Sequence, residues 1–218
     1  MLEKTAIILA GGTSQGFPED KGALLLDNKP LIRRVFNIVE PIVDEIIIVT
    51  NTQERTDLYA KLLPETAKFV IDKQPGQGPL VAAITGFEAA QGKYSMLLPY
   101  DSPFVSEELV MLLFDLSIGK TAAVPRNPDN EIEPLCSVYQ TEITLETARQ
   151  VDADGAVDLQ TLVETLRGVR YISTMVIEQI DPDLRSFFSV NTPLDLKRAA
   201  VMLQGKPKAL KSKGHKTK

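Results

Sequence analysis

Residues 6–22 have the sequence AIILAGGTSQGFPEDKG, in which an apolar run passes into a glycine-rich stretch. The β-branched apolar residues predict a buried strand, and Gly11 and Gly12 end it because adjacent glycines free the backbone for turns and close contacts. Successive main-chain N–H groups in such a loop can bind an anion, and Lys21 at its far end adds a compact positive charge within reach of a phosphate. The stretch therefore predicts a nucleotide-binding loop.

Two common glycine motifs do not fit this loop. Gly11 and Gly16 have the spacing of a P-loop, but Phe17 and Pro18 occupy the positions where that motif needs Lys and Ser or Thr. The dinucleotide-binding pattern Gly-x-Gly-x-x-Gly also fails. Whether the pattern is counted from Gly11 or from Gly12, the position of its second glycine holds another residue. Taken by itself, the loop also fits an alternative in which the glycines only shape a strand-to-helix turn and Lys21 is solvated.

Histidine and cysteine each occur once in the 218-residue chain, which narrows the chemistry available to it. His215 lies near the C-terminus, so we expect neither a Ser-His-Asp triad nor a histidine-ligated metal in the folded body. Cys136 cannot form an intramolecular disulfide, and we interpret it as a small buried side chain. Carboxylates, lysines, backbone donors and an oxygen-liganded cation such as Mg²⁺ remain, and these are the groups that phosphoryl and nucleotidyl transfer need.

Charge divides the chain into an acidic body and a basic tail. The whole chain has a formal net charge of −5, and the tail from Lys206 to Lys218 contains six lysines and no acid, so the body carries −11. An acidic body is a poor surface for nucleic acid, and the tail is typical of a disordered extension, with contact to RNA or anionic lipid as the alternative. No segment has the apolar length that crosses a bilayer, and no signal peptide precedes the first strand. We therefore expect a cytoplasmic protein without a membrane partner.

Predicted strands and helices alternate along the chain, which favours one α/β domain. Near-continuous apolar runs predict strands buried on both faces, as in a parallel sheet. Thr192 and Pro193 predict the N-cap and the first position of a last helix. The predicted strands lie at residues 6–10, 23–26, 45–50, 68–71, 94–99, 121–125, 135–139, 170–173 and 187–190, and the predicted helices lie at 30–42, 56–63, 80–91, 142–149, 158–166 and from Pro193 onward.

Three polar residues stand at or just beyond the C-terminal ends of predicted strands. They are Asn51, Asp72 and Asp101, and the glycine loop follows a strand in the same way. Ligands of open α/β sheets bind outside the carboxyl ends of the strands, so these residues can converge on one site. For Asp101 the alternative is an Asx turn that caps the next helix.

Seven short motifs occur in the order, and close to the spacing, of one known family. They extend over roughly residues 5–204 and resemble the molybdenum cofactor guanylyltransferases, the MobA-like nucleotidyltransferases. One motif of this length would be a weak signal, whereas seven in register indicate the superfamily. The motifs are Leu9-Ala10-Gly11-Gly12, Asp20-Lys21-Gly22, Lys29-Pro30-Leu31, Gly78-Pro79-Leu80, Asp101-Ser102-Pro103-Phe104, Glu133-Pro134-Leu135 and Val190-Asn191-Thr192-Pro193.

The resemblance implies a fold. It implies a single Rossmann-like nucleotidyltransferase domain over residues 1–204, with a mostly parallel central sheet and helices on both faces in a three-layer α/β/α arrangement. The Lys-rich tail then covers residues 205–218.

The resemblance also implies an activity, the movement of GMP from Mg-GTP to the phosphate of molybdopterin with release of pyrophosphate. The cofactor would be Mg²⁺, the substrates GTP and molybdopterin, and other cofactor-biosynthesis proteins are further candidate partners. Lys21 and Asp101 would be catalytic, with Lys21 on the phosphates and Asp101 on the metal, and Asn191 would help to close the site on the acceptor side. The implied nucleotide-binding residues are Leu9, Ala10, Gly11, Gly12, Lys21, Asn51, Asp72, Gly78 and Asp101.

The chain departs from the family pattern at three positions. Gly16 stands where the family has an arginine, Pro18 replaces the last loop glycine, and Tyr100 replaces a cysteine. Glycine cannot provide the planar fork that arginine offers to phosphate oxygens, and losing such a contact costs on the order of 1.5–3 kcal/mol. Two alternatives therefore stay open: a related nucleotidyltransferase with another NTP or acceptor, and a nucleotide-binding protein with little catalysis.

Overall fold

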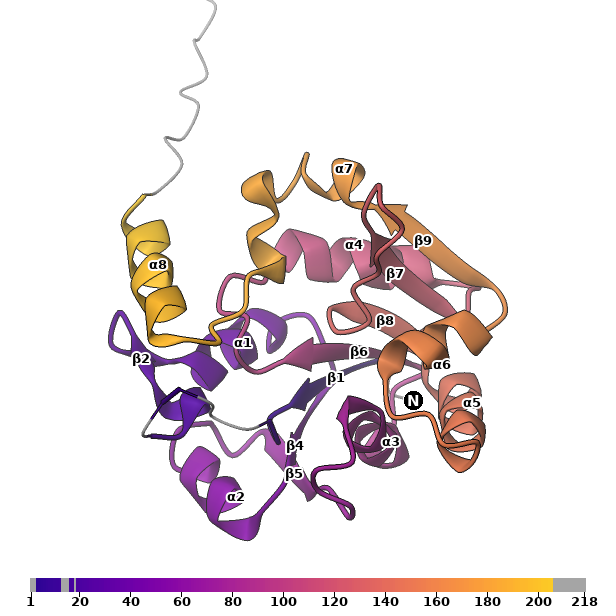
Figure 1. Ribbon diagram of the computed structural model, residues 1–218, viewed down its shortest axis with the longest axis horizontal. Helices are drawn as coiled ribbons and strands as arrows, with labels where there is room; N and C mark the ends of the chain where they lie inside the picture. Colours follow the sequence, from indigo (N-terminus) through magenta and orange to yellow (C-terminus); the bar gives the residue numbers. More distant parts are fainter. Residues whose placement is uncertain (1–2, 13–15, 18, 206–218) are drawn as a thin grey trace, which may run out of the picture.

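A seven-stranded sheet forms the centre of the protein in the computed structural model, which describes residues 3–12, 16, 17 and 19–205 (Figure 1). The strand order is β5-β4-β1-β6-β8-β7-β9. Strands β5, β4, β1 and β6 are parallel, β8 runs antiparallel to β6 and β7, and β9 is parallel to β7. The prediction of a mostly parallel sheet is confirmed. The strands are β1 Lys4–Leu9, β4 Glu45–Thr50, β5 Ala67–Ile71, β6 Tyr94–Pro99, β7 Ala122–Arg126, β8 Ser137–Gln140 and β9 Val169–Ser173.

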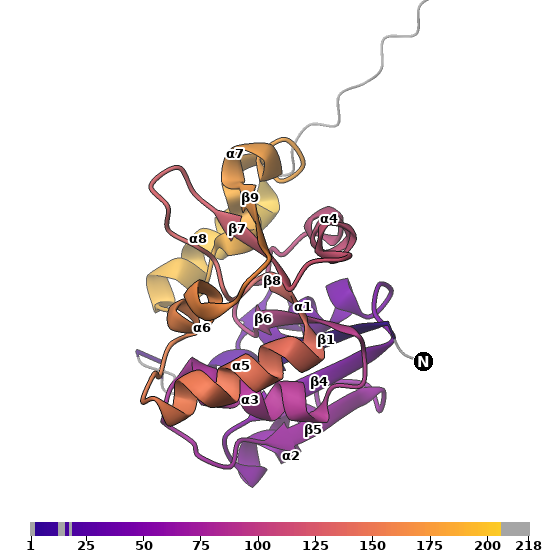
Figure 2. The same cartoon turned by 90° about the vertical axis from the view of Figure 1, so that its right-hand side faces the viewer.

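Helices cover both faces of the sheet, as the sequence predicts (Figures 1 and 2). Successive residues of β1 point to opposite faces, so Ala6 and Ile8 belong to one apolar cluster and Ile7 and Leu9 to the other. The first face packs against α1 (Leu31–Val39), α2 (Gln53–Ala60), α4 (Glu107–Ser117) and α7 (Thr174–Ile177), and the second against α3 (Pro79–Ala89), α5 (Thr141–Ala153) and α6 (Leu159–Thr165). In the described part of the chain, no helix combines the length and the apolar character needed to cross a membrane.

The C-terminal segment returns to the beginning of the chain. The 3-10 helix η2 (Pro182–Phe187) leads to α8 (Pro193–Gln204), which packs on β2 (Leu25–Leu26). Strand β2 pairs with β3 (Lys29–Pro30) in a separate two-stranded sheet. Segments from near both ends of the described chain are therefore in contact (Figure 1). The buried residues between them are Leu26, Leu31, Val190 and Ala199.

One predicted strand is absent, and the helices α1 and α6 each begin one residue later than predicted. The run 187–190 is not a strand, because η2 ends at Phe187 and the following residues have no regular structure. Its apolar character has another cause, since Phe188 and Val190 pack into the cluster under α8. Pro30 is the N-cap of α1 and not its first residue. Thr192 is the N-cap of α8, as the sequence predicts.

Glu45 is the first residue of β4, and its buried carboxylate forms hydrogen bonds to three other segments of the chain. It accepts hydrogen bonds from Lys68 Nζ at 2.7 Å, from the Gln91 main-chain N–H at 2.8 Å and from Thr5 Oγ1 at 2.9 Å. Burial by itself would raise the pKa of Glu45, but these hydrogen bonds outweigh it and the pKa is lowered. The charged form of Glu45 therefore stabilises the fold.

We expect Glu45→Gln to lower the free energy of unfolding at neutral pH by about 1–3 kcal/mol. A carboxyl whose folded-state pKa is lowered stabilises the protein above its unfolded pKa, and this contribution is lost as the pH falls through the folded value. The difference in the free energy of unfolding between wild type and variant should therefore shrink below about pH 4.5. Urea unfolding at pH 7 and pH 3 measures it, with the exposed Glu65→Gln as control. An equal difference at both pH values would contradict this account.

Candidate active site

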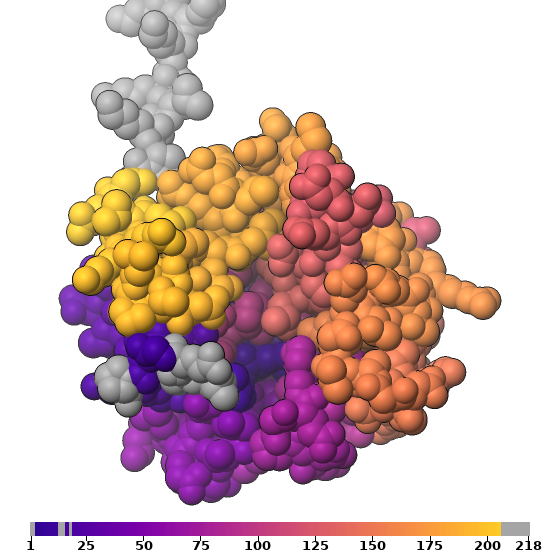
Figure 3. All heavy atoms as spheres, viewed as in Figure 1, coloured from indigo at the N-terminus to yellow at the C-terminus, as the bar shows by residue number. Residues whose placement is uncertain are grey.

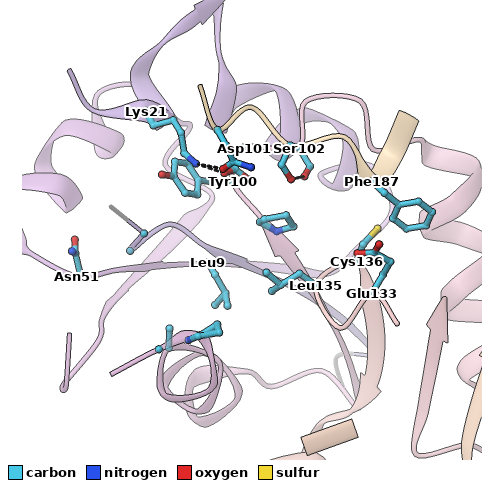
Figure 4. Close-up of a pocket in the computed structure, with 18 of the residues that line it drawn as sticks. Leu9, Lys21, Asn51, Tyr100, Asp101, Ser102, Glu133, Leu135, Cys136 and Phe187 are labelled. Atoms are coloured by element: carbon cyan, nitrogen blue, oxygen red, sulfur yellow. Dashed lines mark hydrogen bonds and ion pairs between the residues drawn. The ribbon is translucent and has the colours of Figure 1, made fainter. Parts of the chain in front are cut away.

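A cleft of about 520 Å³ opens at the C-terminal ends of β1, β4, β5 and β6. Figure 3 shows it as a hollow near the middle of this face, and Figure 4 shows the side chains on its walls. The glycine loop, the start of α3, the turn after β6, the loop before β8 and the segment after η2 form these walls. Nine of the ten predicted site residues line the cleft: Leu9, Gly11, Gly12, Lys21, Asn51, Asp72, Gly78, Asp101 and Asn191.

Ala10 is the predicted site residue that does not line the cleft. Its side chain is buried in the core on the α1 face of the sheet. Its N–H donates to the Val49 carbonyl at 2.8 Å, which extends the pairing of β1 with β4 by one residue. Ala10 therefore fixes the point at which the glycine loop leaves the sheet.

Lys21, Asp101 and Asn191 meet in the cleft, although 170 residues separate Lys21 from Asn191. Lys21 begins the 3-10 helix η1 (Lys21–Ala23), and its Nζ forms an ion pair with Asp101 Oδ2 (Figure 4). The same Nζ donates to Asn191 Oδ1 at 3.0 Å. The side chains of Lys21 and Asp101 are only 7% and 10% exposed. Because electrostatic interactions strengthen away from water, these groups can act strongly on a charged ligand.

Asp101 does not cap the next helix, so the alternative role for it is wrong. Helix α4 begins at Glu107, and its N-cap is Ser106, whose Oγ accepts a hydrogen bond from the Leu109 N–H at 3.1 Å. Asp101 lies five residues before this cap and its carboxylate faces Lys21. Its side chain therefore belongs to the cleft.

Asn51 and Asp72 lie at the end of the cleft formed by β4 and β5. Asn51 Oδ1 accepts a hydrogen bond from Arg55 Nη1 at 3.0 Å, so the amide nitrogen is the group that can donate to a ligand. Asp72 is 7% exposed and adds a carboxylate acceptor.

Gly78 precedes α3 with a φ of +102°, and a Cβ there would lie 2.5 Å from the Val157 carbonyl oxygen, so only glycine fits. No side chain caps the start of α3, whose N–H groups are suited to an anion.

An arginine that the sequence analysis did not identify holds the glycine loop to α2. Arg55 Nη1 donates to the Gly12 carbonyl at 2.9 Å, and its Nε pairs with Asp20 Oδ2 at 2.7 Å. Asp20 also accepts from the Gly22 N–H at 2.9 Å and from the Tyr59 hydroxyl at 2.6 Å. Both ends of the loop are therefore fixed to one helix.

The end of the cleft away from Asn51 is lined by Glu133, Leu135, Cys136 and Phe187 (Figure 4). Cys136 is buried, as the sequence predicts, and burial raises the pKa of its thiol, so the thiol stays protonated at neutral pH. Glu133 extends into the open space of the cleft. This end thus combines apolar side chains with a single carboxylate.

Comparison with known proteins identifies the family. A model of the MobA-like NTP transferase domain matches residues 6–169. This chain belongs to the MobA-like NTP transferase family. It is 32% identical over 204 residues to a probable molybdenum cofactor guanylyltransferase of Natronomonas pharaonis. This match covers 93% of this chain and 100% of that protein. It is 30% identical to a probable molybdenum cofactor guanylyltransferase of Methanosarcina acetivorans, over 93% of this chain and 92% of that protein.

Solved structures share the fold of this MobA-like NTP transferase. Molybdopterin-guanine dinucleotide biosynthesis protein A from Archaeoglobus fulgidus has a TM-score of 0.77 at 24% identity, over 92% of this chain and 98% of that one. The 4-diphosphocytidyl-2C-methyl-D-erythritol synthase from Anaerococcus prevotii has a TM-score of 0.72 at 15% identity, over 93% and 96%. These two structures show the fold, whereas the family match and the relatives named above identify the chain as a nucleotidyltransferase.

The MobA-like NTP transferase presents one carboxylate, Asp101, where the resemblance predicts a metal ion. Across the residues that the structure describes, no three His, Cys, Asp or Glu side chains gather in a metal-binding arrangement. Magnesium does not need such a cluster, because one or two carboxylates commonly hold it together with substrate phosphates and water. The nearly buried oxygen donor of Asp101, on the wall of the cleft, fits such an ion.

Two buried tyrosines beside the glycine loop of this MobA-like NTP transferase provide a test of the loop contacts. The Tyr59 hydroxyl donates to Asp20, whereas the Tyr100 hydroxyl has no hydrogen-bond partner in the described part of the chain. Burial is the main cause that raises the pKa of both hydroxyls, so both stay protonated. The two side chains therefore differ in the hydrogen bond and not in charge.

We expect Tyr59→Phe to lower the free energy of unfolding by about 1.5–3 kcal/mol, because it removes a buried hydrogen bond to a charged acceptor. Tyr100→Phe should leave that free energy unchanged or raise it, since it removes an unsatisfied buried hydroxyl. Chemical denaturation of the two variants and the wild type measures both effects. Equal losses in the two variants would show that the hydroxyl contacts are not the cause.

Proposed function

We propose that this protein moves GMP from Mg-GTP to the phosphate of molybdopterin and releases pyrophosphate. The observation that carries the proposal is the meeting of Lys21, Asp101 and Asn191 with the glycine loop in one cleft of an NTP transferase. The names of the relatives from Natronomonas and Methanosarcina support the choice of GTP and molybdopterin.

In this proposal the nucleotide occupies the part of the cleft between β5 and the glycine loop. The Asn51 amide donates to the nucleoside and the Asp72 carboxylate accepts from it. The triphosphate lies along the main-chain N–H groups of Gly11 and Gly12. Its charge is directed toward Lys21, whose ammonium group stabilises the non-bridging phosphate oxygens as negative charge shifts during transfer.

The transfer itself needs no histidine base. A phosphate oxygen of the acceptor, which is already an anion at neutral pH, attacks the α-phosphorus of GTP. The bond from that phosphorus to the oxygen shared with the β-phosphate breaks, and pyrophosphate leaves with the electron pair. Nucleotidyltransferases of this family generally use a divalent metal ion; we propose Mg²⁺ held by Asp101, where it neutralises phosphate charge. Lys21 and Asn191 hold the reacting phosphates in position.

Pyrophosphate release from purified protein tests the proposal. The assay offers GTP, ATP, CTP and UTP in turn, each with molybdopterin and with sugar-phosphate and alcohol-phosphate acceptors. We expect the highest kcat/KM for GTP with molybdopterin. A higher value for another pair would identify a related nucleotidyltransferase, and no release with any pair would identify a nucleotide-binding protein with little catalysis.

The surroundings of the protein are part of the proposal. We place it in the cytoplasm, without a membrane or nucleic-acid partner, where it could meet other cofactor-biosynthesis proteins. Residues 206–218, which hold the lysine tail and His215, lie outside the described residues.

A further inference from the structure

Glu133 brings a carboxylate to the end of the cleft that the proposed function leaves for the acceptor. Its side chain lies beside Leu135, Cys136 and Phe187, on the opposite side of the cleft from Asn51 (Figure 4). No hydrogen bond or ion pair joins this carboxylate to any residue that the structure describes. Its acceptor oxygens are therefore unused within the described protein.

The backbone around Glu133 is held firmly, in contrast to its carboxylate. The Glu133 N–H donates to the Pro125 carbonyl at 3.0 Å, and the Glu133 carbonyl accepts from Ser137 Oγ at 2.5 Å. The next carbonyl, of Pro134, accepts from the Tyr139 hydroxyl at 2.8 Å. These main-chain hydrogen bonds fix the position of Glu133 on the wall of the cleft. Binding sites commonly preorganise a ligand-recognising side chain in this way.

The electrostatic surroundings of Glu133 favour a ligand that donates hydrogen bonds. The pKa of Glu133 is raised mainly because neighbouring protein atoms remove water from its carboxyl group, and the negative charge of Glu131 is the second cause. The buried Asp181 adds another acid near Cys136 in this part of the protein. A carboxylate in such surroundings gains from N–H donors and repels phosphate.

We propose that Glu133 recognises the ring of the acceptor by accepting hydrogen bonds from a ring N–H and an adjacent exocyclic amino group. The ligand class is a flat aminopyrimidinone heterocycle, such as the pterin part of the acceptor in the proposed function, on which this inference rests. The half-buried Leu135 and Phe187 provide apolar surface for its faces. Because Glu133 repels phosphate and Lys21 attracts it, the two residues orient the acceptor with its phosphate toward the nucleotide.

Glu133→Gln tests this inference, with Glu131→Gln as the matched control. Both variants remove one negative charge from the same loop, but Glu131 does not line the cleft and its carboxylate instead accepts from Asn127 Nδ2 at 2.9 Å. We expect Glu133→Gln to raise KM for molybdopterin about ten- to a hundredfold, because a charge-assisted acceptor is lost, and to leave KM for GTP within about twofold. Glu131→Gln should leave both KM values near those of the wild type.

A pair of ring analogues gives a readout that does not depend on turnover. Pterin carries the exocyclic amino group and lumazine has a carbonyl oxygen in its place, so the wild type should bind pterin at least about tenfold more tightly. Glu133→Gln should lose this preference, because a glutamine amide can donate to the lumazine carbonyl. Ligand fluorescence titration measures all four dissociation constants.

Three results would overturn the inference. They are an unchanged KM for molybdopterin in Glu133→Gln, an equal rise in KM for both substrates, and a pterin preference that survives the substitution. Thermal unfolding excludes a merely structural role, since removing an unpaired acid beside Glu131 should not destabilise the protein. A wild type that turns over no GTP with molybdopterin would overturn the proposed function itself, and this would be evident before any variant is measured.

Discussion

Asp101→Asn is expected to reduce the rate of GMP transfer by about 10²–10³-fold, the usual cost of removing one charge-stabilising group from a reacting centre. The substitution keeps the size of the side chain but removes the negative charge that pairs with Lys21 and is proposed to hold the metal ion. The Asp101 main-chain carbonyl still accepts the Val190 N–H at 2.9 Å, so the segment before α8 should stay in place. Steady-state pyrophosphate release at saturating GTP measures the loss.

Two controls separate catalysis from folding in this experiment. Asp115→Asn removes an exposed acid from α4, far along the helix from the cleft, and should keep full activity. Circular dichroism and thermal unfolding of Asp101→Asn show whether the fold is retained. If a folded Asp101→Asn protein kept wild-type turnover, the metal assignment would be wrong.

Arg55→Gln is expected to raise the dissociation constant for Mg-GTP about ten- to a hundredfold, through loss of charge-assisted bonds worth roughly 1.5–3 kcal/mol. The variant loses the guanidinium that joins the Gly12 carbonyl, Asn51 and Asp20. Gly16 cannot compensate, because it has no side chain and its φ of +85° disfavours an arginine there. Isothermal titration calorimetry with a non-hydrolysable GTP analogue measures the effect.

The matched control for Arg55 is Arg149→Gln on α5. Arg149 pairs with Glu88 at 2.8 Å, its side chain is 57% exposed, and exposed pairs contribute little. Arg55→Lys keeps the charge but not the planar fork, so its affinity should fall between wild type and Arg55→Gln. Equal affinities of Arg55→Gln and Arg149→Gln would show that the contacts to the glycine loop do not support nucleotide binding.

The sheet could be predicted from the sequence because each strand is recognisable from its own residues. The predicted bounds of β4 and β6 agree with the structure, since each strand is an apolar run buried on both faces. The same topology explains why Asn51, Asp72 and Asp101 reach one cleft, because β4, β5 and β6 end at the same edge.

Contacts between distant segments could not be predicted in this way. No spacing rule links Asp20 to Arg55 and Tyr59, whose meeting depends on how α2 packs beside the glycine loop. The only usable signal was that opposite charges occur at positions 20 and 55, and many other pairs share it. Glu133 belongs to one of the seven motifs, but its orientation depends on hydrogen bonds between distant segments, such as the one from its N–H to the Pro125 carbonyl.

The wide separation of Lys21 and Asn191 has a consequence for synthesis of the protein. A ribosome adds residues from the N-terminus onward, so Lys21 leaves the exit tunnel long before its partner 170 positions later has been translated. Nascent chains that stop before residue 191 therefore lack Asn191 and also the helix that packs over β2. Such incomplete products contain the first strands of the sheet, but they lack the complete site that the proposed transfer from GTP needs.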